Sequence, residues 1–217
     1  MFNENAVELL KKGVSELNFS LSGEQIQNFI FYLGELKKWN KAYNLTAILD
    51  DREIIIKHFL DSMLYLKALP QEEIKVADIG SGAGFPGIPI KLLRPEIKMF
   101  LIEPSVKKTV FLKHVIWELR LKDISVIQNR IEKVRVNYDI EQPVDVAVTR
   151  ALFSTEDFLK KTSHIIKKNG LLVLNKGPKI KEEIKELKNI KSNIITFSLP
   201  LTDIKRNIIV LQLSNPD

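Results

Sequence analysis

The chain has 217 residues, enough for one large domain or for one domain with an extension. It contains no cysteine, which excludes disulfides, cysteine-rich zinc sites and a cysteine nucleophile. The formal net charge of +6 is compatible with a polyanionic partner. Neither a long apolar run nor a signal-peptide pattern occurs, so we expect a cytoplasmic protein without a membrane segment.

The first third of the chain is predicted to be helical. Apolar residues between Ala6 and Leu17 recur close to the helical period of 3.6 residues. Ser22, followed three residues later by Gln25, is typical of a helix start with a capping box. A third helix is expected at about 51–66. We predict that residues 1–70 form an N-terminal helical extension, packed on a domain formed by residues 71–217.

From Lys75 onward, strand-like and helix-like segments alternate. The predicted strands are 75–79, 98–103, 124–128, 144–149, 170–175, 194–199 and 207–213, and the predicted helices are 86–93, 106–120, 155–168 and 179–190. Such alternation indicates a mostly parallel sheet. Only a turn separates the last two strands, so we expect them to pair as an antiparallel hairpin. The pattern predicts a doubly wound α/β fold with a seven-stranded, Rossmann-like sheet.

The most informative stretch runs from Lys75 to Gly87, with the sequence K-V-A-D-I-G-S-G-A-G-F-P-G. A short apolar strand ends at Gly80, alternating glycines follow, and a helical pattern comes after them. Glycine tolerates positive φ and lets the backbone approach a ligand closely. The stretch therefore predicts the nucleotide-binding corner of an open α/β sheet.

Two glycine patterns compete within this stretch. Gly82-x-Gly84-x-x-Gly87 fits the dinucleotide motif, whereas Asp78-x-Gly80-x-Gly82-x-Gly84 fits that of S-adenosylmethionine-dependent methyltransferases. The dinucleotide reading would bring the carboxylate of Asp78 toward a pyrophosphate, which it repels. A ligand with an amino group and a sulfonium suits that carboxylate better. We therefore favour S-adenosylmethionine and keep a nicotinamide-dependent oxidoreductase as an alternative.

A second acidic residue, Glu103, ends the strand predicted at 98–103. A carboxylate at this position can bind both ribose hydroxyls of an adenosine. Both cofactor readings share this role, so Glu103 supports adenosine binding without choosing between them.

Several further motifs together carry a family resemblance. They are Trp39-Asn40-x-x-x-Asn44-Leu45-Thr46, His58-Phe59-Leu60-Asp61-Ser62, the G-F-P-G-I-P run after Gly82, Arg130-x-Glu132, Arg150-Ala151 and Lys176-Gly177. Over nearly its whole length the chain resembles the bacterial RNA methyltransferases called glucose-inhibited division protein B. That family methylates guanine N7 in small-subunit ribosomal RNA. The resemblance implies S-adenosylmethionine as cofactor, S-adenosylhomocysteine as product, and small-subunit ribosomal RNA or its assembling ribonucleoprotein as partner.

The resemblance also implies which residues bind the cofactor. Glycine-loop residues and Phe85 would line the pocket, the segment from Glu103 would hold the ribose, and Ile131 with Glu132 would bracket the adenine. This chain has Arg-Ile-Glu at 130–132 where the family usually has Arg-Ala-Glu. The full predicted set is Asp78, Gly80, Gly82, Gly84, Phe85, Glu103, Pro104, Ser105, Ile131, Glu132 and Arg150.

The residues present favour methylation of guanine N7. Methylation of pyrimidine carbon 5 commonly needs a cysteine, and the P-P-[YF] signature of amine methylation is absent after the fourth predicted strand. Guanine N7 has a free lone pair and needs no general base, so catalysis would rest on positioning. Ribose 2′-O-methylation, with Lys176 as base and Asp145 in support, is an alternative. A cofactor-binding ribosome assembly factor without turnover is another.

Two residues are candidates for catalysis. Arg150 would donate a hydrogen bond to guanine O6 or to a flanking phosphate. Asn44, which is difficult to bury without partners, would belong to the pocket wall together with Asn40 and Thr46. We expect no metal site, because His58 has no cluster of partner ligands, and we expect a monomer.

Overall fold

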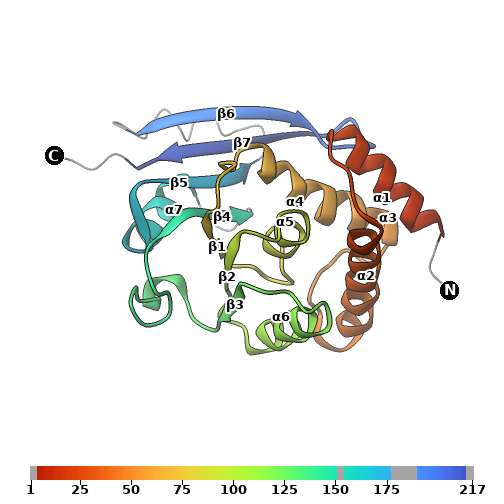
Figure 1. The fold of residues 1–217 in the computed structure, drawn as a ribbon, viewed down its shortest axis with the longest axis horizontal. Coiled ribbons are helices and arrows are strands. Elements are labelled where there is room, and N and C mark those ends of the chain that lie inside the picture. The colour runs from red at the N-terminus through yellow and green to blue at the C-terminus, as the bar shows by residue number, and fades with distance from the viewer. Residues whose placement is uncertain (1–3, 151–153, 177–189, 214–217) are drawn as a thin grey trace.

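The computed structural model describes residues 4–150, 154–176 and 190–213. Seven strands form one sheet in the order β3-β2-β1-β4-β5-β7-β6, as the ribbon in Figure 1 shows. Their bounds are β1 (Lys75–Ile79), β2 (Lys98–Ile102), β3 (Ile124–Ile127), β4 (Val144–Arg150), β5 (Ile166–Lys176), β6 (Lys191–Ser198) and β7 (Lys205–Gln212). Neighbouring strands from β1 to β5 are parallel, and β7 lies antiparallel between β5 and β6. The predicted mostly parallel sheet and terminal hairpin are therefore confirmed.

Successive strand residues face two different cores, because side chains alternate between the faces of a sheet. In β1, Val76 belongs to the first core, whereas Ala77 and Ile79 belong to the second. Helices α5 (Gly87–Leu93) and α6 (Val106–Glu118) contribute to the first core. Helix α7 (Thr155–Thr162) packs into the second core through Phe158. Helices thus cover both faces, as a doubly wound sheet requires.

The N-terminal helices are α1 (Glu4–Glu16), α2 (Gly23–Tyr43) and α3 (Asp51–Ile54). The predicted capping box is present, with Ser22 and Gln25 each bonding the other's backbone N–H. After α3 the helical backbone continues as a π-helix (Ile55–Leu60), α4 (Asp61–Met63) and a 3-10 turn (Leu64–Lys67). These helices share the first core with α5 and α6. The division into 1–70 and 71–217 stays a prediction.

The helix predicted at 155–168 is too long. Helix α7 ends at Thr162, a 3-10 turn covers Ser163–Ile165, and β5 begins at Ile166 instead of residue 170. Ile166 pairs with Val144 of β4, so sheet pairing overrides the helical pattern of this stretch. The helix predicted at 179–190 lies outside the described residues, apart from its last position.

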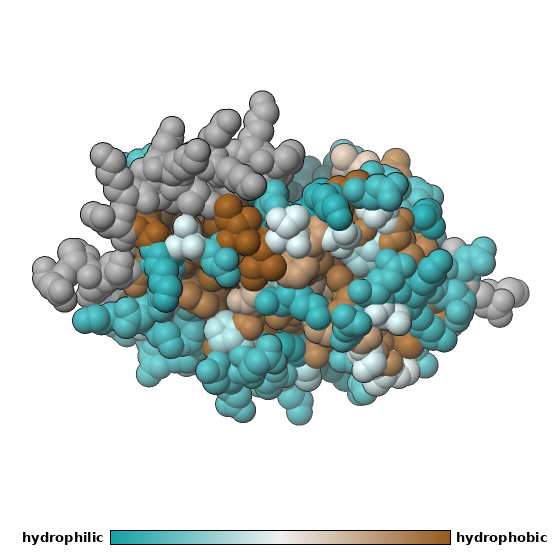
Figure 2. Space-filling model, turned by 90° about the horizontal axis from the view of Figure 1, so that it is seen from above, coloured by the Kyte–Doolittle hydropathy of each residue, from teal (hydrophilic) through white to brown (hydrophobic). Residues whose placement is uncertain are grey.

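The β6 side of the molecule, seen from above in Figure 2, has hydrophobic residues near its centre and hydrophilic residues around them. Strand β6 contributes the half-buried Ile194, Ile195 and Phe197. It is the last strand in the sheet order, so these residues mark an edge and not the centre of the fold. Within the described segments, no helix is both long enough and apolar enough to cross a membrane.

Candidate active site

The site lies where the strand order reverses. Strand β1 pairs with β2 on one side and with β4 on the other. The carboxyl ends of these three strands therefore meet, and open α/β sheets bind ligands at this position. Three residues predicted to be functional lie at these ends: Gly80 after β1, Glu103 after β2, and Arg150 as the last residue of β4.

The glycine loop adopts the backbone that its composition predicts. Gly80, Gly82 and Gly84 have φ values of 72°, 59° and 103°. The N–H groups of Gly80 and Ser81 both donate to the carbonyl of Ile102, at 2.8 and 3.2 Å. The end of β2 therefore holds the start of the loop.

Helix α2 also holds this loop. The buried Tyr32 hydroxyl donates to the carbonyl of Ala83 at 2.5 Å. A Cβ added to Gly84 would lie 2.6 Å from Cδ1 of Ile88 and 2.7 Å from the Tyr32 oxygen. Gly84 is therefore required both by its positive φ and by the close approach of two side chains.

Asp78 at the end of β1 is completely buried. Its Oδ2 accepts a hydrogen bond from the N–H of Gly87 at 2.9 Å. Its Oδ1 is buried without a partner among the described residues. Burial raises the pKa of this carboxyl from 3.8 to about 7. A buried carboxylate oxygen with spare acceptor capacity fits the cationic cofactor predicted for this loop.

Glu103 is held by backbone donors on both of its oxygens. Oε2 accepts from the N–H of Gly82 and Oε1 from the N–H of Ser105, each at 2.9 Å. Each carboxylate oxygen can accept further hydrogen bonds. Glu103 thus links the glycine loop to the start of α6 and can still receive two ribose hydroxyls.

His58 connects the glycine loop to Arg150. Its ring stacks on Phe85, with centroids 4.4 Å apart and planes 17° from parallel. Nδ1 lies 2.9 Å from the Arg150 guanidinium, and Nε2 lies 2.8 Å from the hydroxyl oxygen of Thr46. Because arginine can only donate, Nδ1 must accept, and the neutral ring carries its proton on Nε2. Burial, with the positive charge of Arg150 as a smaller contribution, lowers the pKa of His58 to about 3.

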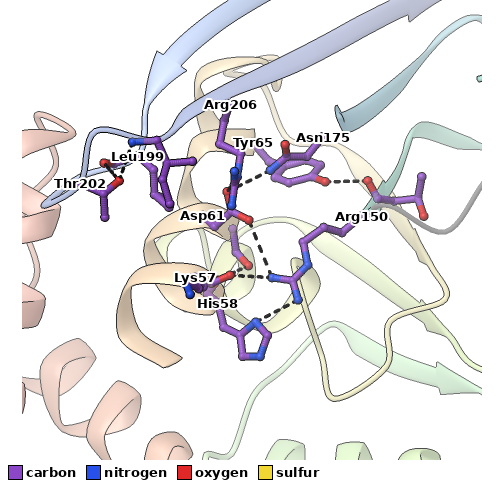
Figure 3. A network of polar contacts seen from close by, with 12 residues as sticks. Lys57, His58, Asp61, Tyr65, Arg150, Asn175, Leu199, Thr202 and Arg206 are labelled. Atoms are coloured by element: carbon purple, nitrogen blue, oxygen red, sulfur yellow. Dashed lines mark hydrogen bonds and ion pairs between the residues drawn. The ribbon is translucent and has the colours of Figure 1, made fainter. Parts of the chain in front are cut away.

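Arg150 is held from several sides (Figure 3). One guanidinium nitrogen donates to the carbonyl of Lys57 at 3.0 Å and lies 3.9 Å from Oδ2 of Asp61. Oδ1 of Asp61 accepts from Asn175 at 3.0 Å and from Nε of Arg206 at 2.9 Å. The side chain of Asp61 is only 6% exposed. The guanidinium therefore keeps one position beside Phe85, 5.5 Å from the ring centroid.

The family assignment follows from the comparison with known proteins. Residues 25–208 match the family model described as rRNA small subunit methyltransferase G. This chain belongs to that family. The resemblance seen in the sequence is thereby confirmed.

Two relatives show how far the likeness extends. The Ribosomal RNA small subunit methyltransferase G of Acetivibrio thermocellus is 39% identical over 211 residues, which cover 94% of this chain and 87% of that protein. The protein of the same name from Clostridium botulinum (strain Loch Maree) is 38% identical and covers 94% and 89%. These relatives therefore correspond to nearly the whole chain.

Solved structures at lower identity confirm the fold alone. An S-adenosylmethionine-dependent methyltransferase from Aquifex aeolicus aligns with a TM-score of 0.54 at 18% identity, covering 81% of this chain and 96% of that one. A methyltransferase from Geobacter sulfurreducens aligns with a TM-score of 0.57 at 13% identity, covering 84% and 90%.

Not every residue predicted for this methyltransferase G site joins it. Ile131 is buried in the second core, and Pro104 is exposed. Glu132 is exposed and forms an ion pair with Lys161, whose hydrogen bond lowers the pKa of Glu132. Their cofactor roles stay predictions.

Asn44, which was predicted to belong to a pocket wall, is exposed. It caps α2 in the left-handed conformation, with φ 51° and ψ 55°, and its N–H donates to the carbonyl of Asn40. Asparagine tolerates this conformation better than most residues, so the backbone alone accounts for its presence. Among the described residues no hydrogen bond or ion pair joins Asn44 to Arg150, and the catalytic role of Asn44 stays a prediction.

Lys176 and Asp145, the general base and its supporting carboxylate in the alternative of ribose methylation, do not lie together. Asp145 lies near the start of β4, where it pairs with Lys167 and accepts from the N–H of Lys75 at 2.6 Å. Lys176 is the last residue of β5. Its neighbour Asn175 lies opposite Arg150 in the register of β4 and β5. Strand geometry separates Lys176 from Asp145 by roughly 20 Å. Within the described ranges, no group of three or more candidate metal ligands occurs.

Sequence reasoning identified Arg150, His58 and Asp61 but missed Asn175 and Arg206. Asn175 was seen only as the last residue of a predicted strand, and Arg206 directly precedes another. Their role depends on β7 lying next to β5, which brings both side chains to Asp61. The sequence indicated these two residues only through the predicted strands, and a predicted strand does not specify that β7 lies next to β5.

Proposed function

We propose that this chain transfers the methyl group of S-adenosylmethionine to N7 of a guanine in small-subunit ribosomal RNA. The relatives named ribosomal RNA small subunit methyltransferase G support the substrate class. The carboxyl ends of β1, β2 and β4 support the cofactor, through Glu103, the glycine loop and the unpaired oxygen of Asp78. When bound, the cofactor supplies an electrophilic methyl group on a sulfonium.

The observation that carries the choice of N7 is the absence of an available general base around Arg150 in the described residues. His58 uses both ring nitrogens, and its pKa of about 3 keeps it a weak base. Asp61 accepts from the amide of Asn175 and from Arg206, and it lies beside a second cation, Arg150. Around Arg150 the site therefore offers fixed donors, and Oδ1 of Asp78, which has no partner in the described segments, is fully buried. Guanine N7 is a nucleophile that has no proton to lose.

Arg150 then acts by positioning and by electrostatics. Its guanidinium is oriented by the Lys57 carbonyl and by His58, and its side chain stays 24% exposed. The exposed donors face guanine O6 or a flanking phosphate, which leaves the N7 lone pair aimed at the methyl group. A donor fixed before the substrate arrives costs no reorganisation during the reaction.

The partner is small-subunit ribosomal RNA, either free or within the assembling ribonucleoprotein, and we place the reaction in the cytoplasm with the chain acting as a monomer. The net charge of +6 supports attraction to RNA. Binding through phosphate contacts should weaken steeply as the salt concentration rises.

The test is transfer of tritiated methyl groups to unmethylated small subunits and to naked small-subunit RNA, followed by nucleoside analysis. We expect the label in 7-methylguanosine. Label on a ribose oxygen or an exocyclic amine would overturn the proposed position. Cofactor binding without any transfer would instead favour a silent assembly factor.

Arg150→Ala should lower turnover by roughly 100-fold or more, because a fixed charged donor is lost. Arg135→Ala is the matched control, since Arg135 is exposed and precedes β4. Unfolding curves of both variants would show that the loss of turnover is not a loss of fold. Near-normal turnover of Arg150→Ala would contradict the role.

A further inference from the structure

A cavity of about 490 Å³ lies beside the helical segment that carries His58. Its walls come from the end of α2 and from the segment that follows it. They include Asn40, Asn44 and Thr46, the polar residues of the motif at 39–46. Of these residues, only Thr46 is connected to Arg150 in the part of the chain that the structure describes, through its bond to His58.

Thr46 has a hydroxyl proton left to donate. Its oxygen accepts from the N–H of Ile48 at 3.1 Å and from Nε2–H of His58, 2.8 Å away. The direction of the second bond follows from the neutral state of His58, whose Nδ1 accepts from Arg150. Both lone pairs of the hydroxyl are then used, and its proton has no acceptor among the described residues. Since Thr46 lines the cavity, its hydroxyl can donate to an acceptor of a ligand bound in the cavity.

The cavity wall is built firmly. Asn40 is only 7% exposed, and its side chain holds Thr46 with two hydrogen bonds of 2.9 Å, one to the carbonyl of Thr46 and one from its N–H. Asn44 beside it is exposed, and its side-chain amide offers a donor and an acceptor together. An amide of this kind can pair with two neighbouring groups on a base edge.

The remaining lining suits a nucleotide. Lys41 is exposed and has no ion pair within the described part of the chain, whereas Lys37 is paired with Asp51. Apolar walls are supplied by Leu36, Ile48, Leu49 and Ile54. Among them, Leu49 is 69% exposed. The flat faces of a nucleobase can pack on the apolar walls, and its polar edge can bond Thr46 and Asn44. The phosphate of the same nucleotide can then contact Lys41.

The cavity lies one imidazole ring away from the proposed reaction centre. Thr46 binds one ring nitrogen of His58 and Arg150 binds the other, on nearly opposite sides of the ring. His58 therefore separates the cavity from Arg150 and Phe85. A base held here is a neighbour of the methylated guanine and not that guanine itself.

We propose that this cavity binds one nucleotide of the substrate RNA that flanks the target guanine. Thr46 donates to the base edge, Asn44 pairs with it, and Lys41 contacts its phosphate. This inference rests on the proposed function, because it takes the ligand to be the RNA that is methylated.

A chemical footprint tests the inference directly. The chain has no cysteine, so Ala47→Cys would place a single thiol in the cavity wall. The rate of alkylation by iodoacetamide is measured alone, with S-adenosylhomocysteine, and with that compound plus unmethylated small-subunit RNA. With RNA at about ten times its Kd, alkylation should slow about tenfold. S-adenosylhomocysteine alone should leave the rate unchanged.

Abasic substitution shows whether a base enters the cavity. Once nucleoside mapping has located the methylated guanine, its neighbours are replaced by abasic residues one at a time. We expect that an abasic residue at one position beside the methylated guanine abolishes the protection of the thiol at position 47 from alkylation. The alkylation rate of the control Tyr43→Cys should be the same for every abasic RNA. Protection that is equal for every RNA, or absent, would overturn the inference. If methylation of guanine still occurs in that case, the proposed function survives.

Kinetics provide a second readout. Ala47→Trp fills the cavity without removing any hydrogen bond described above, and Asn44→Gly removes the amide at a position where glycine accepts the backbone. Each should raise the KM for RNA roughly tenfold, as expected for the loss of one bound base. The cofactor Kd should not change. Lys41→Ala should raise the KM as well, whereas the control Lys12→Ala on α1 should not. An unchanged KM in both cavity variants would refute the assignment.

Discussion

Two buried aspartates at the same edge of the sheet are used in different ways. The carboxyl group of Asp78 receives one hydrogen bond, from the backbone of Gly87, and its second oxygen has no partner in the described structure. Asp61 receives Asn175 and Arg206 on one oxygen, and Arg150 lies 3.9 Å from the other. The carboxyl group of Asp78 can therefore accept a further hydrogen bond. We call the group of Asp61, Arg150, Asn175 and Arg206 the closed region, because these side chains bind one another.

The difference has an energetic meaning. Burying a carboxylate with too few partners costs stability, and an active site can bear that cost where a ligand supplies the missing contacts. A carboxylate that binds several cations and amides instead holds distant segments together. The contacts of Asp61 fix the position of Arg150 beside the glycine loop, where the cofactor is proposed to bind.

The largest expected effect comes from breaking the closed region. Asp61→Ala leaves Arg206 and Asn175 without their acceptor, and it leaves the charges of Arg150 and Arg206 without the carboxylate that compensates them. We expect the free energy of unfolding to fall by about 3 kcal/mol, measured by denaturant titration. Glu53→Ala removes a half-exposed carboxylate that pairs with Lys57 in the same helical segment, and it should cost less than about 1 kcal/mol. Equal losses in the two variants would show that Asp61 is not a structural hub.

The glycine loop offers a matched pair of substitutions. A Cβ at Gly84 would meet Ile88 and Tyr32 at 2.6 and 2.7 Å, at a φ of 103°. A Cβ at Gly82 would meet nothing closer than 3.9 Å, at a φ of 59°. We expect Gly84→Ala to cost about 3 kcal/mol and Gly82→Ala about 1 kcal/mol of unfolding free energy. If thermal or denaturant unfolding gave the reverse order, the loop packing described here would be wrong.

The pH dependence of stability should separate His58 from Asp78. Between pH 6.5 and about 3, the unfolded chain protonates His58 and the folded chain does not, so stability falls as the pH falls. Between pH 3.8 and about 7, folded Asp78 keeps a proton that the unfolded chain releases, so stability falls as the pH rises.

The two effects oppose each other in the window that they share. Each changes the slope of unfolding free energy against pH by at most about 1.4 kcal/mol per unit. Between pH 4 and 6.5, His58→Gln should make the slope more negative and Asp78→Asn should make it more positive. Denaturant unfolding at several pH values measures both slopes. Shifts in the same direction would contradict the assigned charge states.

The ligand-binding region could be predicted from the sequence because its contacts are encoded locally. Strand β1 has the predicted bounds, and Asp78 and Gly87 are nine residues apart in one motif. The closed region could not be predicted in the same way. Asp61 meets Asn175 across 114 residues and Arg206 across 145, through a sheet neighbour relation that no short pattern encodes.

Local reasoning also misjudged individual residues for physical reasons. The position of Asn44 at the end of a helix, in a left-handed conformation, was not predicted. The end of the helix predicted at 155–168 gave way to pairing between β4 and β5. Both depend on what surrounds the segment in space.

Calorimetric titration of the purified chain with S-adenosylmethionine and, separately, with NAD tests the central claim most directly. We predict one S-adenosylmethionine bound per chain, no binding of NAD, and an affinity for S-adenosylmethionine at least about tenfold weaker in Glu103→Ala, since a buried charged acceptor is lost. Binding of NAD in place of S-adenosylmethionine, or an unchanged affinity in Glu103→Ala, would contradict the account.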